Sequence, residues 1–299
     1  MNTYRISMSP IDRTIVRLAK RTDIASIYEL CKIEHWNYSL KMIERLIAYE
    51  PNGCFVAEVK GGFAGQVFSI DYGTVGWIGV LIVNESHRRK GIGSLLMKQA
   101  MRHLLNSDTE TIRLEAVPEI AHLYHKLGFV DEFYSLRFLG DSRRKKLPVR
   151  VSIRRMSEDE IFRIAGFDKK YFGGDRTRVL RRLYQDSPEL CFFSQKASKI
   201  NGYIISYEME NGYRIGPWVC NPRSMNAQLV AQSLLLTCMN NIENNTKLYV
   251  GVPEVSNIAI SLLHYLDFKM VSKSIHMYFG KRPQKRPAGI LSISGPENG

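Results

Sequence analysis

A strand, a cationic glycine-containing loop and a helix follow one another directly between Val80 and Leu96, in the sequence VLIVNESHRRKGIGSLL. The stretch from Trp77 to Val83 is almost continuously apolar, which is typical of a strand buried on both faces. The residues after the loop recur at helical spacing and mark one apolar helix face: Ile92, Leu95, Leu96, Gln99, Ala100 and Leu104. This junction indicates an α/β fold.

The loop itself, Arg88-Arg89-Lys90-Gly91-Ile92-Gly93, has the features of an anion site. The first N–H groups of a helix lack intrahelical acceptors and lie at the positive end of the helix dipole. Gly91 and Gly93 carry no side chain, so an anion can reach the backbone directly. The three cations favour a dianion such as a pyrophosphate. The sequence contains no GxxxxGK[ST] phosphate loop, and a dinucleotide fingerprint would need a third glycine where Leu96 stands.

The first half of the chain alternates between strand and helix patterns in the order β-α-α-β-β-β-α-β-α-β. Ser39 and the pair Thr22-Asp23 are predicted to open helices. The predicted strands are Val16 to Leu18, Gly53 to Val59, Phe63 to Ile70, Trp77 to Val83, Thr111 to Ala116 and Phe129 to Leu139. A basic linker from Asp141 to Pro148 ends this half.

The second half repeats that order more faintly, from a strand at Val149 to Arg154 to a last strand at Phe268 to Phe279. Ser157 and Glu160 form a predicted capping box. Two landmarks recur at similar spacing. Ile78-Gly79 matches Ile215-Gly216, and Leu127-Gly128-Phe129 matches Leu266-Asp267-Phe268. A tandem duplication is the preferred interpretation, and two unrelated α/β domains are the alternative.

Composition agrees with two soluble domains in 299 residues. The five cysteines are scattered without a CxxC pair, which predicts buried, reduced thiols and disfavours a zinc site. No apolar run approaches the ~20 residues of a membrane span, and the N-terminus lacks the apolar core of a secretory signal. A cytoplasmic protein without membrane segments is expected. The sequence does not indicate its oligomeric state.

The net charge of +13 is concentrated in two clusters, one at 143–155 and one at 281–286. We expect a linker and a solvated basic tail (281–299). No base-stacking aromatic is interleaved with either cluster, which disfavours a nucleic-acid partner.

The stretch from about Ile15 to Gly140 resembles the GNAT superfamily of N-acyltransferases. The shared pattern is a hydrophobic strand, [QR]xxGx[GA], a helix, a strand and a helix with a Tyr…Gly-Phe signature. In this chain those parts are Leu81-Ile82-Val83, Arg88…Gly91…Gly93 and Leu123-Tyr124-His125-Lys126-Leu127-Gly128-Phe129. The resemblance implies an α/β (α+β) fold of tandem GNAT-like domains, 14–140 and 149–280. Each would be a mixed, mostly antiparallel sheet flanked by helices.

The same resemblance implies how acetyl-CoA, the acyl donor, would bind. The amides of the loop would hold the pyrophosphate, and backbone groups of Leu81 and Val83 would pair with the pantetheine arm as an added strand does. Tyr124 would act as the acid for the departing thiolate, and the Val83 N–H would stabilise the oxyanion. The expected acyl-CoA contacts are Leu81, Ile82, Val83, Arg88, Arg89, Lys90, Gly91, Ile92, Gly93 and Ser94. No metal is implied.

The general base is open at this point, because the strand from Trp77 to Val83 offers no carboxylate or imidazole. Glu34 is the first candidate, since the resemblance places the loop between the first two helices near the acceptor. His35, Trp36 and Asn37 of the same loop are candidate acceptor contacts. Glu115 is the second candidate base, whereas His122 and His125 are expected to be exposed helix residues. A water relay or an already neutral amine would serve as well.

The second copy is expected to be degenerate, and the further resemblance is to two-domain GNAT proteins with a decayed C-terminal copy. Aligning Val83-Asn84 with Cys220-Asn221 places Met225, Gln228 and Val230 at the loop cation and glycines, and Leu263 at Tyr124. Bulky side chains there would keep an anion from the backbone. A role in walling an acceptor pocket is expected, with a carboxylate for a cationic amine from Asp175, Glu208 or Glu254.

The function expected from the resemblance is acetyl transfer from acetyl-CoA to a primary amine, most simply a small molecule, by direct attack in a ternary complex. A non-catalytic acyl-CoA sensor is the alternative, favoured by the missing base. Modification of a protein amine or tRNA, docked on the basic linker, is a third hypothesis.

Overall fold

The computed structural model describes residues 14–143, 151–283 and 288–299. The cations predicted for the linker at 144–150, and Lys285 and Arg286, fall outside the described residues. The chain divides into two compact units. The first comprises 14–71 and 78–108, and the second comprises 72–77 and the described part of 109–299. This division does not coincide with the predicted boundaries at 140 and 149, and strand β4 (Val75–Val83) has residues in both units.

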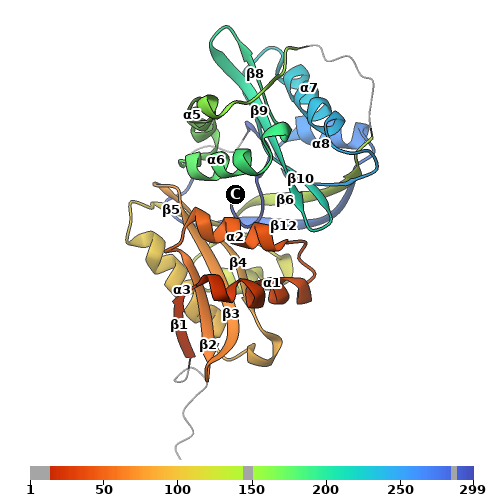
Figure 1. Ribbon diagram of the computed structural model, residues 1–299. Helices are drawn as coiled ribbons and strands as arrows, with labels where there is room; N and C mark the ends of the chain where they lie inside the picture. Colours follow the sequence, from red (N-terminus) through yellow and green to blue (C-terminus); the bar gives the residue numbers. More distant parts are fainter. Residues whose placement is uncertain (1–13, 144–150, 284–287) are drawn as a thin grey trace, which may run out of the picture. The chain divides into compact units, whose positions relative to one another are not determined.

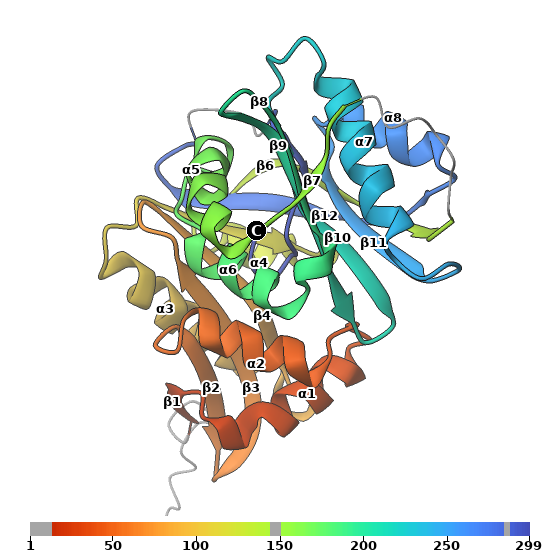
Figure 2. The same ribbon diagram turned by 45° about the horizontal axis from the view of Figure 1, so that its top comes forward.

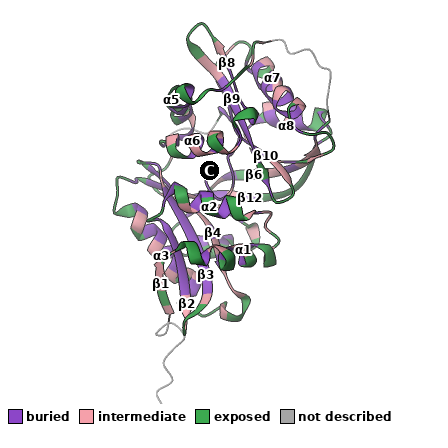
Figure 3. Cartoon of the chain, viewed as in Figure 1, coloured by how far each residue is buried: buried purple, intermediate pink, exposed green. Residues whose placement is uncertain are grey.

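The first unit has the predicted strands and helices. Strands β1 (Thr14–Leu18), β2 (Cys54–Val59) and β3 (Gly62–Asp71) are successively antiparallel. Helices α1 (Ile24–Ile33) and α2 (Leu40–Tyr49) pack on one face of β3, and α3 (Ile92–Leu105) packs on the other (Figure 1). Figure 3 shows most of β2 and β3 buried, whereas β1 has only intermediate and exposed residues and the helices keep exposed faces.

Local sequence explains the start and the orientation of α2. The Ser39 hydroxyl accepts a hydrogen bond from the Met42 N–H at 3.3 Å and caps the helix, as predicted. Met42 and Ile43 lie four and three residues before Leu46, so all three share one helix face, and all are buried.

The second unit carries the remaining elements, which Figure 2 shows from a second direction. Its strands are β5 (Thr111–Ala116), β6 (Val130–Asp141), β7 (Arg154–Arg155), β8 (Cys191–Lys196), β9 (Lys199–Met209), β10 (Gly212–Cys220), β11 (Lys247–Pro253), β12 (Lys269–Gly280) and β13 (Ile290–Ser292). Its helices are α4 (Ala121–His125), α5 (Ile161–Phe172), α6 (Thr177–Asp186), α7 (Ala227–Asn240) and α8 (Asn257–Tyr265). Short 3-10 turns lie at Arg21–Asp23, Glu85–His87, Pro118–Ile120, Glu158–Glu160 and Pro188–Leu190 across both units.

Several predictions of detail are confirmed, and one is only partly met. Ser157 and Glu160 form the predicted capping box before α5. All five cysteines are buried and free. The strand predicted from Val149 to Arg154 is reduced to β7, because residues 151–153 have no strand structure and Val149 and Arg150 are not described.

The strands of the second unit do not form a separate sheet for each predicted domain. The order is β5-β12-β6-β11-β10-β9-β8-β7, with β13 paired to β10. Strand β12, the last strand of the predicted second domain, therefore lies between β5 and β6, both of the predicted first domain. We call β6 and β12 the exchanged strands. Each has 12 residues and a similar pattern, so sequence alone could not select their partners.

The exchange obeys the internal repeat. In the antiparallel pair β6–β12, Ser135 is the register partner of Ser274, and these two residues are also equivalent in the repeat, 139 positions apart. The pair β5–β12 matches Ile275 with Ala116, as the pair β6–β11 matches Leu136 with Val252. A local two-fold relation therefore runs through the contact of Ser135 with Ser274.

The ends of α4 and α8 support the same repeat. Gly128 and Asp267 both have left-handed backbones, with φ of 90° and 67°. The Phe129 N–H donates to the Tyr124 carbonyl at 3.1 Å, and the Phe268 N–H donates to the Leu263 carbonyl at 2.9 Å. Tyr124 and Leu263 thus occupy equivalent positions, as the alignment predicted.

The basic flexible tail predicted for 281–299 is wrong for its last part. Strand β13 pairs with β10, and residues 290–299 are almost wholly buried. The Ile293 N–H donates to the Gly251 carbonyl of β11 at 2.9 Å, and the Tyr207 hydroxyl donates to the Ser294 carbonyl at 2.8 Å. The prediction of a solvated tail was based on the cations at 281–286. The apolar residues Ile290 and Leu291 that follow them are buried and hold the end of the chain against the second unit.

No helix in the described ranges is both long and apolar enough to cross a membrane.

A buried carboxylate, Glu115, contacts both Ser135 and Ser274. Glu115 of β5 is 1% exposed at its side chain. Its Oε1 accepts from the Ser135 hydroxyl at 2.7 Å and lies 3.0 Å from His276 Nδ1. Its Oε2 accepts from the Ser274 hydroxyl and from Arg137 at 3.2 Å. Burial is the largest single effect and raises the pKa of Glu115, but His276, Arg137 and Ser274 together outweigh it and lower the pKa to about 2.

Replacing this carboxylate is expected to cost stability in a pH-dependent way. Glu115→Gln should lower the free energy of unfolding at pH 7 by roughly 3 kcal/mol, from the difference between 4.5 and about 2. The folded-state pKa is depressed, so this contribution is present above pH 4.5 and is lost as pH falls towards 2. Urea unfolding at pH 7 and pH 3 measures the difference in the free energy of unfolding between wild type and Glu115→Gln. This difference should be smaller at pH 3.

Glu110→Gln is the matched control, because the exposed Glu110–Lys281 ion pair should contribute less than about 1 kcal/mol. A gap between wild type and Glu115→Gln that stays constant from pH 7 to pH 3 would contradict the assignment.

Candidate active site

The predicted anion loop connects β4 to α3 in the first unit. Asn84 ends the strand and its side chain accepts from the Ser86 N–H at 3.1 Å, which fixes the short turn that follows. Arg89 and Gly91 have left-handed backbones, with φ of 61° and 79°, and Gly91 is the N-cap of α3. This conformation leaves the first amides of α3 without partners in the helix.

Packing does not require a glycine at position 93. A Cβ added there would make only an ordinary contact, 3.6 Å from Val83 Cγ2. Gly93 has no positive φ either. Its missing side chain therefore leaves the backbone at the start of α3 open, as an anion site needs.

The loop cations are exposed, and two of them donate to nearby backbone carbonyls, one at the end of β4 and one in the loop. Arg88 Nε donates to the Val83 carbonyl at 3.0 Å, and Lys90 Nζ donates to the Ser86 carbonyl at 2.7 Å. Arg88 also forms an ion pair with Glu34. The structure thus brings the predicted base Glu34 to the anion loop, where it orients a cation.

The other predicted acceptor residues lie in the same α1–α2 loop as Glu34. His35 is exposed and has φ of 57°. Trp36 and Asn37 are half-buried, and the Trp36 ring lies edge-on to Tyr38 with centroids 5.8 Å apart.

Strand β4 has a distorted backbone immediately before the predicted acyl-CoA segment. Val80 has φ of 54°, an uncommon conformation for a β-branched residue. Leu81, Ile82 and Val83 follow it, with Leu81 and Val83 half-buried. Strained backbone of this kind gathers at functional sites.

Tyr124 belongs to the second unit, on α4, and is 7% exposed. Burial raises the pKa of Tyr124 to about 12, so its hydroxyl keeps its proton at neutral pH. The ring also packs edge-on to Phe129, with centroids 6.1 Å apart. Tyr124 therefore combines a packing role with a protonated hydroxyl. His122 and His125 of the same helix are exposed, as predicted.

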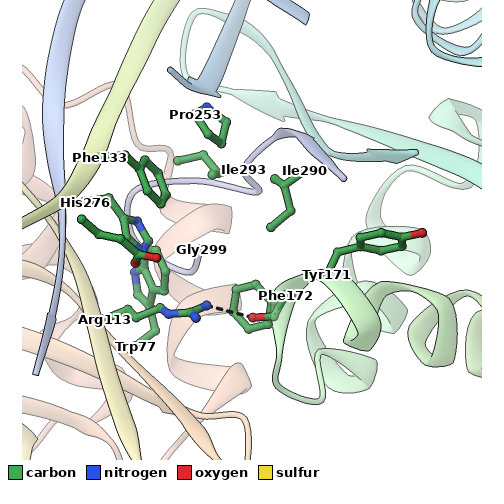
Figure 4. Close-up of a pocket in the computed structure, with 11 residues that line it drawn as sticks. Trp77, Arg113, Phe133, Tyr171, Phe172, Pro253, His276, Ile290, Ile293 and Gly299 are labelled. Atoms are coloured by element: carbon green, nitrogen blue, oxygen red, sulfur yellow. Dashed lines mark hydrogen bonds and ion pairs between the residues drawn. The ribbon is translucent and has the colours of Figure 1, made fainter. Parts of the chain in front are cut away.

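Sequence reasoning missed a pocket in the second unit, shown in Figure 4. We call it the inner pocket. Its walls combine aromatic rings with ionisable groups and include Trp77, Arg113, Glu132, Phe133, Phe172 and His276. His276 had no signal in the sequence, because its partner Glu115 lies 161 positions away and only the exchange of β12 brings them together.

A second cavity, the outer pocket, adjoins the inner pocket. Glu132 and Phe133 line both, and Asp131 and Glu254 add carboxylates to the outer one. Of the carboxylates predicted for a cationic amine, Glu254 is thus at a pocket. Asp175 instead accepts from the Thr177 N–H at 2.9 Å at the start of α6, and Glu208 is exposed on β9.

The second copy has no glycine at its loop. Helices α3 and α7 both have 14 residues, so matching their starts places Asn226 at Gly91 and Gln228 at Gly93. This corrects the sequence alignment by two positions, because the loop before α7 (221–226) is two residues shorter than the loop before α3 (84–91). The conclusion is unchanged, because side chains stand where the first copy has bare backbone.

The comparisons with known proteins agree with this geometry. A model described as the acetyltransferase (GNAT) family matches residues 22–129, and one described as the acetyltransferase (GNAT) domain matches residues 164–291. The chain is 24% identical over 267 residues to the holothin acyltransferase of Pseudoalteromonas sp. (strain SANK 73390), covering 89% of this chain and 88% of that protein.

Solved structures share the two-domain architecture. A putative acetyltransferase from Pyrococcus horikoshii has a TM-score of 0.79 at 22% identity, with full coverage of both chains. A tandem GNAT protein from the clavulanic acid biosynthesis pathway has a TM-score of 0.60 at 12% identity, covering 91% of this chain and 99% of that one. With a GNAT match in each half, the chain belongs to the GNAT family as a tandem protein, and its second loop lacks the glycines of the first.

Proposed function

We propose that the protein is an N-acetyltransferase that transfers the acetyl group of acetyl-CoA to a primary amine by direct attack in a ternary complex. The observation that carries this proposal is the loop from Arg88 to Gly93. Its left-handed residues Arg89 and Gly91 and its unhindered Gly93 leave helix amides open to an anion. The GNAT family match over 22–129 supports the same assignment. The named relative transfers an acyl group, which supports the reaction class without specifying acetyl.

The proposed acyl-CoA contacts divide by chemistry. The amides from Arg89 to Ser94, with Ile92 and Gly93 between them, hold the pyrophosphate, and the cations Arg88, Arg89 and Lys90 add charge. Backbone groups of Leu81, Ile82 and Val83 accompany the pantetheine arm. Glu34, which pairs with Arg88, is better suited to fixing that arginine than to removing a proton. His35, Trp36 and Asn37 stay proposed acceptor contacts.

Tyr124 is the proposed acid. Its raised pKa keeps a proton available for the departing CoA thiolate at neutral pH. The Val83 N–H is the proposed oxyanion donor, since a strand amide is fixed before substrate arrives.

The second copy is proposed to bind no cofactor, because the chain fills its groove. Beyond Ile215 the parallel pairing of β10 with β11 ends, and β13 pairs with β10 there. Trp218 and Cys220 of β10 correspond to Leu81 and Val83 in the repeat. The Cys220 N–H donates to the Gly289 carbonyl at 2.9 Å. The chain's own backbone thus occupies the position assigned to pantetheine in the first copy.

Gly91→Asp tests the anion loop. The substitution places a side chain and a negative charge at the proposed pyrophosphate site. Losing two charge-assisted hydrogen bonds of roughly 1.5–3 kcal/mol each should weaken CoA binding more than about a hundredfold. Calorimetry with CoA measures the change. Gly61→Asp is the matched control, since Gly61 has the same φ of 79° and open space around it but lies in the β2–β3 turn. Equal CoA affinity in folded Gly91→Asp would remove the basis of the proposal.

Tyr124→Phe tests the acid. Turnover should fall about 10- to 1000-fold, the range for losing a positioned proton donor. Acetyl-CoA affinity should change little, because the ring that packs against Phe129 is kept. Thiol release measured with an amine panel gives the rate. Unchanged turnover would reduce Tyr124 to a packing residue, and acetyl-CoA binding without thiol release for any amine in wild type would favour the sensor hypothesis.

Cofactor stoichiometry tests the second copy. Calorimetry on the full chain should give one CoA per chain, and Gly91→Asp should reduce that number to zero. A second CoA site of comparable affinity would show that the side chains of Asn226 and Gln228, and the filled groove, do not prevent binding.

A further inference from the structure

Gly65 lies inside β3, where a glycine weakens the strand and often marks the close approach of another backbone. Here that backbone belongs to β4, the neighbouring strand of the sheet. A Cβ added at position 65 would lie 2.6 Å from the Ile82 carbonyl oxygen and 3.1 Å from Val83 Cα. Both atoms are main-chain atoms of the first unit, so no side chain can move aside to make room. Only glycine permits this contact.

The contact with Gly65 fixes the direction of one peptide group. The Ile82 carbonyl and the Val83 N–H belong to the same peptide, and in a trans peptide such as this one they point in opposite directions. Because the carbonyl oxygen faces Gly65 on β3, the Val83 N–H points away from β3. The next N–H, of Asn84, points back and donates to the Ala64 carbonyl at 2.9 Å. The peptide is therefore held from the β3 side, and its donor faces the other side of β4.

The second copy has the same glycine. At the end of β10, the Asn221 N–H donates to the Asn201 carbonyl at 2.7 Å, which is the same link as the one that ends β4. The next residue of β9, Gly202, is therefore the equivalent of Gly65. A Cβ at position 202 would lie 2.9 Å from the Val219 carbonyl oxygen. The close approach of strand to glycine is thus repeated in the second unit.

In the second copy, the N–H that this arrangement directs away from β9 has an acceptor. The Cys220 N–H shares a peptide with the Val219 carbonyl, and it donates to the Gly289 carbonyl at 2.9 Å. Gly289 directly precedes β13, in the segment that fills the groove of this copy. The directed N–H therefore binds a carbonyl oxygen of the group in the groove, which here is the chain itself.

From this correspondence we propose that Gly65 is a positioning residue for acyl transfer, because its missing side chain lets the Val83 N–H point at the carbonyl oxygen of the bound thioester. This inference rests on the proposed function. A backbone donor stabilises the charge that develops on the oxygen only when it is held in place before the reaction. Gly65 supplies that restraint without touching the substrate, since it acts through the Ile82–Val83 peptide.

Gly65→Ala should displace this peptide. An ordinary contact of 3.4 Å in place of 2.6 Å requires a shift of about 0.8 Å. A misplacement of about 1 Å can cost about 100-fold in rate, as can the loss of an oxyanion donor. With the fastest amine of the panel, kcat and kcat/KM should therefore fall together by about 100-fold. CoA affinity measured by calorimetry should stay within about 3-fold, because the amides at the start of α3 are unchanged.

The direction of the Val83 N–H can be measured without an acceptor amine. The probe is acetyl-CoA labelled with carbon-13 at the thioester carbonyl, bound to the full chain and observed by infrared difference spectroscopy. A hydrogen bond to the carbonyl oxygen weakens the C=O bond and lowers its stretching frequency. The frequency should be lower in the complex with wild type than in the complex with Gly65→Ala.

Gly62→Ala is the matched control, since it makes the same substitution in the same strand. A Cβ at position 62 would meet only the Val59 carbonyl oxygen, at an ordinary contact of 3.5 Å. This variant should keep the wild-type rate and the wild-type carbonyl frequency.

The outcomes separate the two proposals. Equal carbonyl frequencies in wild type and Gly65→Ala, or a fall in CoA affinity as large as the fall in rate, would overturn the positioning role and leave the acetyltransferase function standing. A frequency difference without thiol release for any amine would contradict the proposed function and keep the Val83 N–H as a carbonyl donor. Failure of acetyl-CoA to bind wild type would overturn both.

A second variant covers the case in which Gly65→Ala does not fold. Replacing Val83 by its α-hydroxy acid converts the Ile82–Val83 amide into an ester and removes the N–H while keeping the side chain. The carbonyl frequency of bound acetyl-CoA should then rise above that in wild type. An unchanged frequency would overturn the proposal, because Gly65 would have no donor to position.

Discussion

The buried charge of Glu115 is the constraint on which the second unit depends. A carboxylate removed from water is tolerated only when several donors surround it. Here the donors come from both exchanged strands, Ser135 and Arg137 on β6 and Ser274 and His276 on β12. Residues more than 100 positions apart must therefore be in register before the charge is satisfied. The same contacts fix the His276 imidazole in the wall of the inner pocket.

Features set by neighbouring residues could be predicted from the sequence. The Ser39 cap and the capping box at Ser157 each depend on a few adjacent positions, and both are confirmed. The apolar face of α3 is confirmed at Ile92, Leu96, Ala100 and Leu104, whereas Leu95 and Gln99 are half-buried. The anion loop could also be predicted from the sequence, because a glycine after a buried strand leaves the backbone amides open to an anion. The backbone conformation of the loop could not be predicted, because nothing in the sequence indicates that Arg89 has a left-handed backbone.

Strand pairings and side-chain contacts between residues far apart in the sequence could not be predicted. Strands β6 and β12 have equal length, and either arrangement of them satisfies the local pattern. The place of β13 depends on the gap that opens where β10 leaves β11, which no local rule encodes. His276 shows the same limit. His276 stands in an unremarkable strand pattern, and its meaning comes from Glu115, Glu132 and Trp77, which belong to three other strands.

The exchanged strands also set the order in which the chain can fold as it is made. Strand β5 leaves the ribosome early, but its partner β12 follows only after some 130 further residues beyond Asp141. At about 5–20 residues per second that interval lasts roughly 6–26 s. During it the edge of β5 is open, and β6 is the nearest strand that can pair with it wrongly. Either β6 stays undocked until β12 is made, or an early β5–β6 pair has to open again, so the first copy reaches its final strand order only after the second is synthesised.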